Sequence, residues 1–268
     1  MTDRPDYLLA GRAPELERLR LQSTVWEPAG RAVLARLPRV AGAQALDIGC
    51  GAMGWLRALS QWAGDGGHVT GTDVEDRMLD AARAFTADAG LANAAIVRDD
   101  LFASALPAAS FDLVHARFQL APLGRADEQL DAYRRLVRPG GTLVLEEPDS
   151  GSWRVHPDAP ACARLIALIV DGFRSAGGDF DAGRTLPSRL RERGLEPSVD
   201  AHVVALDPGH PYLALPLQFA ASLRPRLATL AGDAALDALL RDAEAELARP
   251  GTWGTTFTLV QAWATVPA

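Results

Sequence analysis

The sequence predicts an α/β fold in which a mostly parallel β-sheet is covered by helices on both faces. Short apolar runs alternate with amphipathic helical segments over the first ~150 residues, and glycines follow the first apolar run. Crossover connections between parallel strands are right-handed, so successive helices are expected on both sides of the sheet. The chain of 268 residues is long enough to bury such a core without disulfides.

The expected elements can be placed in order along the chain. Residues 15–37 have apolar side chains at helical spacing, and Pro28 is expected to interrupt this region. Buried strands are expected over 45–48, 68–72, 95–97, 111–116 and 142–145. Helices are expected around 55–62 and over 75–89 and 127–137, the last ending before Pro139-Gly140-Gly141.

The last third of the chain has a different pattern. Helices are expected over 159–173, 182–193, 213–230 and 234–248, and strands over 199–206 and 255–264. We interpret residues 1–40 as an N-terminal helical cap, 41–150 as the cofactor-binding core and 151–268 as the completion of the sheet. Residues 207–252 form a helical lid insertion before the last strand, within one domain overall.

The composition excludes several classes of function. All 27 basic residues are arginine, so neither a Schiff-base lysine nor a P-loop lysine is available. A net charge of −7 argues against a nucleic-acid partner, and no apolar run is long enough to span a membrane. Two cysteines and a charged N-terminus point to a cytoplasmic protein. We expect a small-molecule substrate as the partner, and a homodimer is left open.

A glycine-rich turn follows the first predicted strand. Gly49, Gly51 and Gly54 fit the spacing of a dinucleotide-binding turn, where glycines let the backbone approach a ligand. Asp73 lies 22 residues after Gly51, at the end of the second strand. A carboxylate at this place can accept both ribose hydroxyls of an adenosine. The alternative is a helix N-cap, and we favour the ribose contact.

Two acidic positions argue for a cofactor without phosphate. Asp47 comes two residues before Gly49, where it would repel a pyrophosphate. S-adenosylmethionine instead carries a sulfonium and an ammonium, which suit an acidic site. Asp100 follows the third strand and can accept from an adenine amino group, with Leu101 on the ring. As alternatives, Asp47 orders the glycine turn, and Asp99 and Asp100 cap a short helix.

Together these segments resemble the motifs of class I S-adenosylmethionine-dependent methyltransferases, in order over residues 43–147. The matching segments are Leu46–Gly51, Gly71–Asp73, Asp99–Asp100, Ser110–Val114 and Val137–Thr142. The resemblance implies a Rossmann-like, seven-stranded sheet whose last strand is antiparallel. It also implies that Gly49 and Gly51 approach the methionine part, that Asp73 holds the ribose, and that Asp100 and Leu101 hold the adenine. Val74, directly after Asp73, is a further cofactor-binding candidate.

The N-terminal segment around Gln22 resembles the opening helix of a bacterial small-molecule, ubiquinone-type subgroup, which makes Gln22 a further cofactor-binding candidate. The chain departs from the family at Met53, where many relatives have a small residue. It also has Ala121-Pro122 where that subgroup has a pair of histidines. No general base can therefore be transferred from the subgroup.

The candidates for proton transfer lie near the predicted strand ends or in the insertion. They are His156, His210, Glu147 and Asp149, and each has a structural role as its alternative. Arg117 either meets the methionine carboxylate or pairs with Glu146. His115, inside a strand, is expected in the core. No histidine has metal-ligand spacing, so no metal is predicted.

The sequence therefore predicts direct in-line transfer of a methyl group from S-adenosyl-L-methionine to an O, N or C nucleophile of a small molecule, with S-adenosyl-L-homocysteine as product. One alternative is a protein of the same fold that keeps the cofactor as a binding module or rearrangement catalyst. A nicotinamide-dependent oxidoreductase is the less favoured alternative. The helix around Trp26 and residues 207–252 are expected to roof the substrate cavity, rather than pack on outer helices or form a dimer surface.

Overall fold

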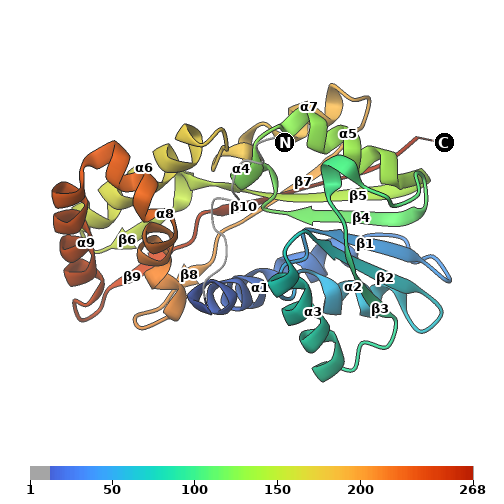
Figure 1. Ribbon diagram of the computed structural model, residues 1–268, viewed down its shortest axis with the longest axis horizontal. Helices are drawn as coiled ribbons and strands as arrows, with labels where there is room; N and C mark the ends of the chain where they lie inside the picture. The colour runs from blue at the N-terminus through green and yellow to red at the C-terminus, as the bar shows by residue number, and fades with distance from the viewer. Residues whose placement is uncertain (1–12, 268) are drawn as a thin grey trace.

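The computed structural model describes residues 13–267. Its central sheet has seven strands: β1 (Gln44–Ile48), β2 (His68–Asp73), β3 (Ala94–Arg98), β4 (Phe111–Arg117), β5 (Val137–Asp149), β7 (Ser198–His202) and β10 (Thr258–Thr265). They lie in the order β3-β2-β1-β4-β5-β10-β7 (Figure 1). The first five pair in parallel, and β10 is antiparallel to β5 and β7. The predicted sheet is confirmed.

The central strands are buried because apolar side chains occupy both of their faces. Every residue of β4 is buried, as are four of the five residues of β1. Such continuous burial is typical of parallel strands with helices on both sides. β5 is longer than the range 142–145 predicted from its apolar run, because the segment from Val137 already follows the preceding strand and pairs with Phe111.

Helices cover both faces of this sheet, as predicted. On one face lie α1 (Ala13–Leu34), α2 (Leu56–Ala63) and α3 (Asp76–Asp88), with Val33, Leu59 and Ala82 in a shared apolar cluster. On the other face α5 (Ala126–Leu136) and α7 (Leu186–Arg191) bury Leu130 and Leu190 against the strands. The central strands are therefore covered on both faces, which leaves the edge at the strand ends for ligands.

The prediction that Pro28 interrupts the first helix is wrong. α1 continues through Pro28 to Leu34. A proline inside a helix removes one hydrogen bond and crowds the preceding turn. Here the neighbouring residues Trp26, Ala29 and Val33 are buried in the core, and this packing outweighs the local cost.

Two further expectations for the C-terminal third need correction. The helix expected over 182–193 is a 3-10 turn, Ala182–Arg184, followed by α7, because Pro187 favours a new helix start. The single strand expected over 199–206 is two strands. β7 joins the central sheet, whereas β8 (Ala205–Leu206) pairs with β9 (Trp253–Thr255) in a second sheet. The alternating sequence pattern does not show where a chain passes from one sheet to another.

A second group of helices and short strands, here called the helical region, lies beside the central sheet (Figure 1). It consists of α6 (Pro160–Ser175), α8 (Leu215–Ala231), α9 (Asp233–Leu247) and a three-stranded sheet of β6 (Arg154–His156), β9 and β8. Figure 1 shows it at the left, beyond the carboxyl end of β5, with α1 below the gap between the two parts. The predicted helical insertion before the last strand is confirmed. Within the described chain, no helix is long and apolar enough to cross a membrane.

Candidate functional site

The glycine turn after β1 has the backbone conformation that its sequence requires. Gly49 has a φ of 62° and Gly51 a φ of 54°, in the left-handed region that favours glycine. A Cβ at Gly49 would lie 2.3 Å from Nε2 of Gln119, which follows β4. The turn therefore needs glycine for its shape, and the end of the Gln119 side chain occupies the space of a Cβ at Gly49.

Asp73 connects this turn to the end of β2. Its Oδ2 accepts from the Gly51 amide at 3.0 Å, and its Oδ1 accepts from the Glu75 amide at 3.0 Å. Burial raises the pKa of Asp73, although these amides partly oppose the shift. Each carboxylate oxygen can accept a second hydrogen bond. Asp73 therefore orders the turn before α3 and does not cap the helix, whose N-cap is Glu75 without a side-chain hydrogen bond. Acceptor capacity remains for the predicted ribose contact.

Asp47 is enclosed by the protein. Its Oδ2 accepts from the Trp55 amide at 2.7 Å, and its Oδ1 lies 2.7 Å from Nδ1 of His115. The side chain is buried, and a Cβ at Gly54 would collide with it. Asp47 therefore orders the glycine turn, which was one of the two interpretations; its contact with a cofactor stays a prediction.

A buried charge cluster lies beneath the turn, formed by Asp47, His115, Glu146 and Gln261. Nε2 of His115 lies 3.2 Å from Glu146, and Gln261 donates to the same carboxylate. Burial alone lowers the pKa of His115, but the Asp47 and Glu146 carboxylates raise it overall. Burial raises the pKa of Glu146, and its contacts with His115 outweigh this and lower it. The ring of Trp55 stacks on His115 at 3.8 Å.

Arg117, at the end of β4, makes the predicted structural pairing. Its Nη1 lies 3.8 Å from Oε2 of Glu146, and its Nη2 donates to the Ser23 hydroxyl on α1 at 3.0 Å. Nη1 has no hydrogen-bond acceptor in the described chain. Glu146 and Ser23 therefore hold the guanidinium from two sides, and Nη1 can still donate a hydrogen bond. Its predicted contact with the methionine carboxylate stays a prediction.

Glu147, a candidate base, is buried in a backbone nest. It accepts from the amides of Gln119 and Leu120 at 2.9 and 2.8 Å, and from the Ala121 amide at 3.1 Å. These amides belong to the start of the short helix α4 (Leu120–Leu123). Burial raises the pKa of Glu147 to about 8, against the effect of the three donors. The carboxyl group thereby fixes the segment after β4.

The other three candidate bases lie on separate elements. Asp149 forms an ion pair with Arg184 at 2.7 Å, which lowers the pKa of Asp149. His156 stacks on Trp253 in the small sheet, and His210 accepts from a backbone amide at the start of a 3-10 turn. Among the described residues, no hydrogen bond or ion pair joins any two of them. The structure thus gives each a structural partner, and their part in proton transfer stays a prediction.

The predicted adenine-side residues lie beside Asp73. The Asp99 amide donates to the Asp73 carbonyl at 3.2 Å, which places the two strand ends together. Asp100 caps a 3-10 turn by accepting from the Phe102 amide at 3.1 Å. Val74 is 41% exposed and Leu101 is half-buried. The cap confirms the structural alternative for Asp100, and these positions suit a ring that stacks between apolar side chains.

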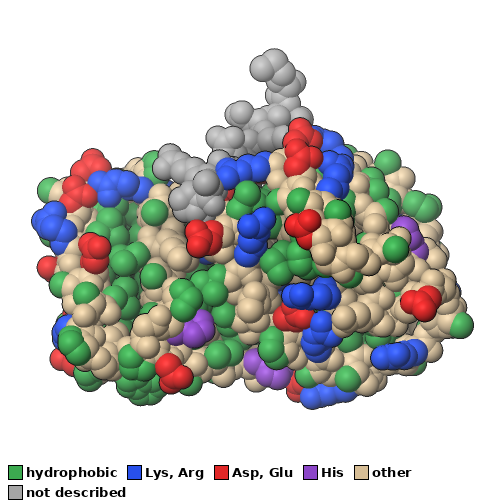
Figure 2. All heavy atoms as spheres, turned by 90° about the horizontal axis from the view of Figure 1, so that it is seen from below, with side chains coloured by type: hydrophobic (Ala, Val, Ile, Leu, Met, Phe, Trp, Pro, Cys, Tyr) green, Lys and Arg blue, Asp and Glu red, His purple; other side chains and the backbone are tan. Residues whose placement is uncertain are grey.

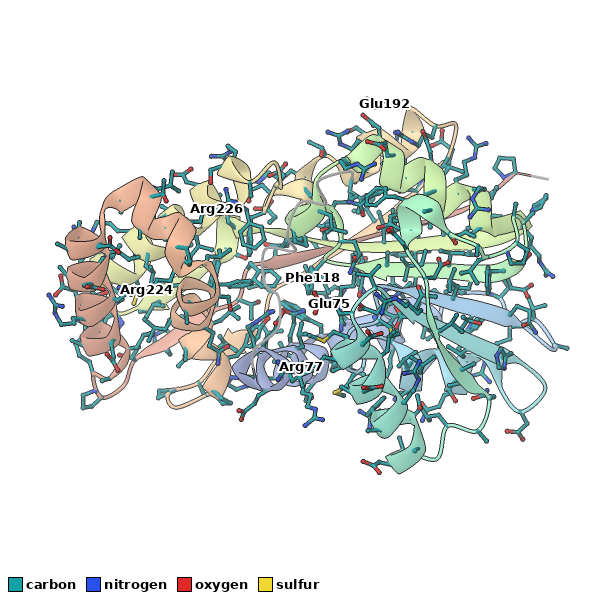
Figure 3. All side chains as sticks on the ribbon, in the orientation of Figure 1. Glu75, Arg77, Phe118, Glu192, Arg224 and Arg226 are labelled. Atoms are coloured by element: carbon teal, nitrogen blue, oxygen red, sulfur yellow. The ribbon has the colours of Figure 1, made fainter. Side chains whose placement is uncertain are left out.

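Arg18, Tyr212 and Phe118 lie near α1 and the chain after β4, and the sequence analysis did not select them as site residues. Arg18 is buried and donates to the predicted candidate Gln22 at 3.2 Å. Trp26 donates to the Tyr212 hydroxyl at 3.3 Å. Phe118 has a φ of 56° and lies centrally in Figure 3, between the sheet and the helical region. A buried arginine in a helix is a signal that could have drawn attention to Arg18; nothing local marks Tyr212.

Sequence comparisons show which known proteins this chain resembles. Residues 45–141 match the family model of a methyltransferase domain. Nocamycin O-methyltransferase from Saccharothrix syringae is 32% identical over 46% of this chain and 44% of its own. Demethylmenaquinone methyltransferase from Staphylococcus epidermidis is 32% identical over 55% of this chain and 56% of its own. The chain spans about half the length of the curated relatives it matches.

Solved structures agree on the fold. A SAM-dependent methyltransferase from Aquifex aeolicus aligns with a TM-score of 0.56 at 16% identity, over 96% of this chain and 100% of that one. The [4+2]-cyclase SpnF aligns with a TM-score of 0.53 at 20% identity, over 90% of this chain and 82% of that one. Residues 45–141 therefore match a methyltransferase domain, and the chain shares the fold of the solved methyltransferase structure from Aquifex aeolicus.

Proposed function

We propose that this protein transfers a methyl group from S-adenosyl-L-methionine to an O, N or C nucleophile of a small molecule by in-line displacement. The observation that carries the proposal is the link from Asp73 to the Gly51 amide, at the carboxyl ends of β1 and β2. It joins the two motifs of the methyltransferase domain in one place, at the edge where open α/β sheets bind ligands.

The residues at this edge fit the cofactor. Asp73 would accept the ribose hydroxyls, and Val74, Asp100 and Leu101 would surround the adenine. Gly49 and Gly51 expose backbone where the methionine part would approach, and Asp47 orders their turn. When bound, the sulfonium supplies a methyl group that is already activated. The protein's task is then to align the substrate and to exclude water.

We further propose that α1 and residues 207–252 roof the substrate cavity within a single domain. Trp26 on α1 contacts Tyr212 through a hydrogen bond and Phe257 through its ring at 5.3 Å. Phe118, directly after β4, contacts Phe257 edge-on at 5.5 Å. Both segments therefore meet beside the end of β4, where an apolar cover would keep the transfer step dry.

The test is a transfer assay with S-adenosylmethionine labelled in its methyl group. The protein is incubated with a panel of phenols, carboxylic acids, amines and quinols, and labelled organic product is counted. Transfer to at least one compound, with equal formation of S-adenosylhomocysteine, is expected. Binding of NAD in place of S-adenosylhomocysteine would contradict the proposal and favour an oxidoreductase.

A second candidate is a protein of this fold that keeps the cofactor without transferring its methyl group. The fold similarity to SpnF favours this candidate, because that protein is described as a [4+2]-cyclase. Such a protein binds S-adenosylmethionine and converts its substrate without releasing S-adenosylhomocysteine. Measuring both products in the same assay separates the two functions.

We propose a cytoplasmic location, a small-molecule partner, and no stable binding to nucleic acid or membrane, with a homodimer as a further possibility. On the face shown in Figure 2, acidic and basic side chains are interspersed and no basic patch stands out. Together with the net charge of −7, this supports the proposed absence of nucleic-acid binding.

A further inference from the structure

Arg18 on α1 is a buried cation with incomplete pairing. It is 3% exposed, and its only hydrogen bond within residues 13–267 is the one from Nη1 to Oε1 of Gln22. Its Nη2 lies 3.9 Å from Oε1 of Glu15, beyond hydrogen-bond distance. Nε and Nη2 have no acceptor among residues 13–267. Burying a guanidinium is costly unless its donors are satisfied, so this group calls for a further acceptor.

Tyr212, in the turn before α8, lies in the positive field of two arginines. Burial raises the pKa of Tyr212 to about 12, and the hydrogen bond from Trp26 and the charges of Arg18 and Arg117 oppose this. Arg18 and Tyr212 both lie at α8: the Arg18 guanidinium lies over the ring of Phe219, and Tyr212 is in the 3-10 turn that leads into this helix. The Tyr212 hydroxyl accepts from Trp26, and its own proton goes to no acceptor in the described chain. Arg18 and the Tyr212 hydroxyl, on two separate elements, thus keep donors that no acceptor in the described chain takes up.

Aromatic rings surround these donors. Arg18 lies over the ring of Phe219, 5.0 Å from its centroid, and Arg117 lies 5.7 Å from the centroid of Phe118. Trp26 and Phe118 both contact Phe257. Ring faces tolerate a cation and also pack against a planar apolar ligand. The surroundings therefore suit an aromatic molecule that bears an acidic group.

We propose that Arg18 and Tyr212 bind the carboxylate of an aromatic acid substrate. This proposal rests on the proposed methyl transfer. The carboxylate would accept from Arg18 and from the Tyr212 hydroxyl, and its ring would lie along the aromatic side chains. Arg18 and Tyr212 lie outside the matched domain at 45–141, in the two segments proposed as the roof. This placement favours the substrate over the cofactor's methionine carboxylate as the source of the anion.

The test compares 1-naphthoate with its neutral analogue 1-naphthamide by calorimetry, with and without saturating S-adenosylhomocysteine. The wild-type protein is expected to bind naphthoate at least tenfold more tightly, because charge-assisted hydrogen bonds are lost with the amide. Arg18→Gln should reduce this preference to less than threefold. Tyr212→Phe, which keeps the ring, should reduce it in the same direction. Arg20→Gln, on the exposed side of α1, is the matched control and should keep it.

Affinity for S-adenosylhomocysteine and for 5′-methylthioadenosine, which lacks the amino-acid part, is measured in parallel. Arg18→Gln is expected to leave both affinities unchanged. Loss of S-adenosylhomocysteine binding alone would assign the site to the cofactor's carboxylate and overturn the proposal. A wild-type protein without preference for naphthoate, or a preference that survives in Arg18→Gln, would also overturn it. The titrations without S-adenosylhomocysteine keep this result separate from a failure of methyl transfer.

Discussion

The central sheet and the helical region of this protein are both well buried, but their interiors differ in chemistry. Beneath the glycine turn the sheet encloses charges: His115 lies between Asp47 and Glu146. The helical region encloses aromatic and aliphatic side chains, among them Phe173 and Phe219. The charged interior fixes the backbone of the turn through specific hydrogen bonds, whereas the apolar interior fixes a shape. The glycine turn is therefore held in place by hydrogen bonds from the buried side chains beneath it, whereas the proposed roof is held by apolar packing.

The largest effect is expected from His115→Leu. The substitution leaves two buried carboxylates without their shared cation, and breaking a buried pair costs roughly 3–5 kcal/mol. The free energy of unfolding, measured with urea, should fall by about this amount. His68→Leu, at an exposed strand start, is the control. Equal stability of the two variants would mean that the charge cluster contributes nothing.

In the helical region, Leu227→Ala should cost about 2–5 kcal/mol, because a fully buried leucine in α8 leaves a cavity. The comparison of the two regions predicts that this substitution lowers stability without changing the cofactor site. The variant should unfold at lower urea, yet its folded form should bind S-adenosylhomocysteine with unchanged affinity. A tenfold loss of affinity in the folded variant would show that the two regions are coupled.

Pro28→Ala should stabilise the protein, by at most about 3 kcal/mol, the difference between these residues in a helix interior. Pro28 is exposed on α1, so the substitution removes no core contact and restores a backbone donor. Urea unfolding measures the change. A loss of stability would show that α1 depends on the local geometry that the proline imposes.

The change that is smallest within any one pH unit is a pH dependence at Glu147. Its pKa is raised to about 8 in the folded protein from an ordinary 4.5, so the folded state binds a proton that the unfolded state has released. Stability therefore falls as pH rises between these values, by at most about 1.4 kcal/mol per pH unit from this group. The stability of Glu147→Gln should lack this part of the pH dependence. Its free energy of unfolding should therefore rise relative to that of the wild type as the pH approaches 8. Parallel stability curves for the two proteins would contradict the raised pKa.

Local patterns predicted the sheet core more completely than the helical region. Gly49, Gly51 and Asp73 are found by spacing, because each satisfies a requirement of its own backbone segment. The α1 residue Arg18 and Tyr212 are almost two hundred positions apart, and no local pattern links them. Pro28 was misjudged because tertiary packing outweighed its local cost, and the strand over 199–206 because alternation does not report a change of sheet. The sequence analysis placed Glu147 near the end of a predicted strand. The three amides that donate to Glu147 could not be predicted, because they belong to the chain after β4.

The most direct test of the central claim is the affinity for S-adenosylhomocysteine of the wild-type protein and of Asp73→Ala. If Asp73 accepts both ribose hydroxyls, the variant loses charge-assisted bonds worth roughly 1.5–3 kcal/mol each. Calorimetry should then show binding to the wild type and at least a tenfold weaker affinity in the folded variant. Unchanged affinity in a folded Asp73→Ala protein would reduce Asp73 to a residue that orders the two local turns. Binding of NAD but not of S-adenosylhomocysteine by the wild type would contradict the account as a whole.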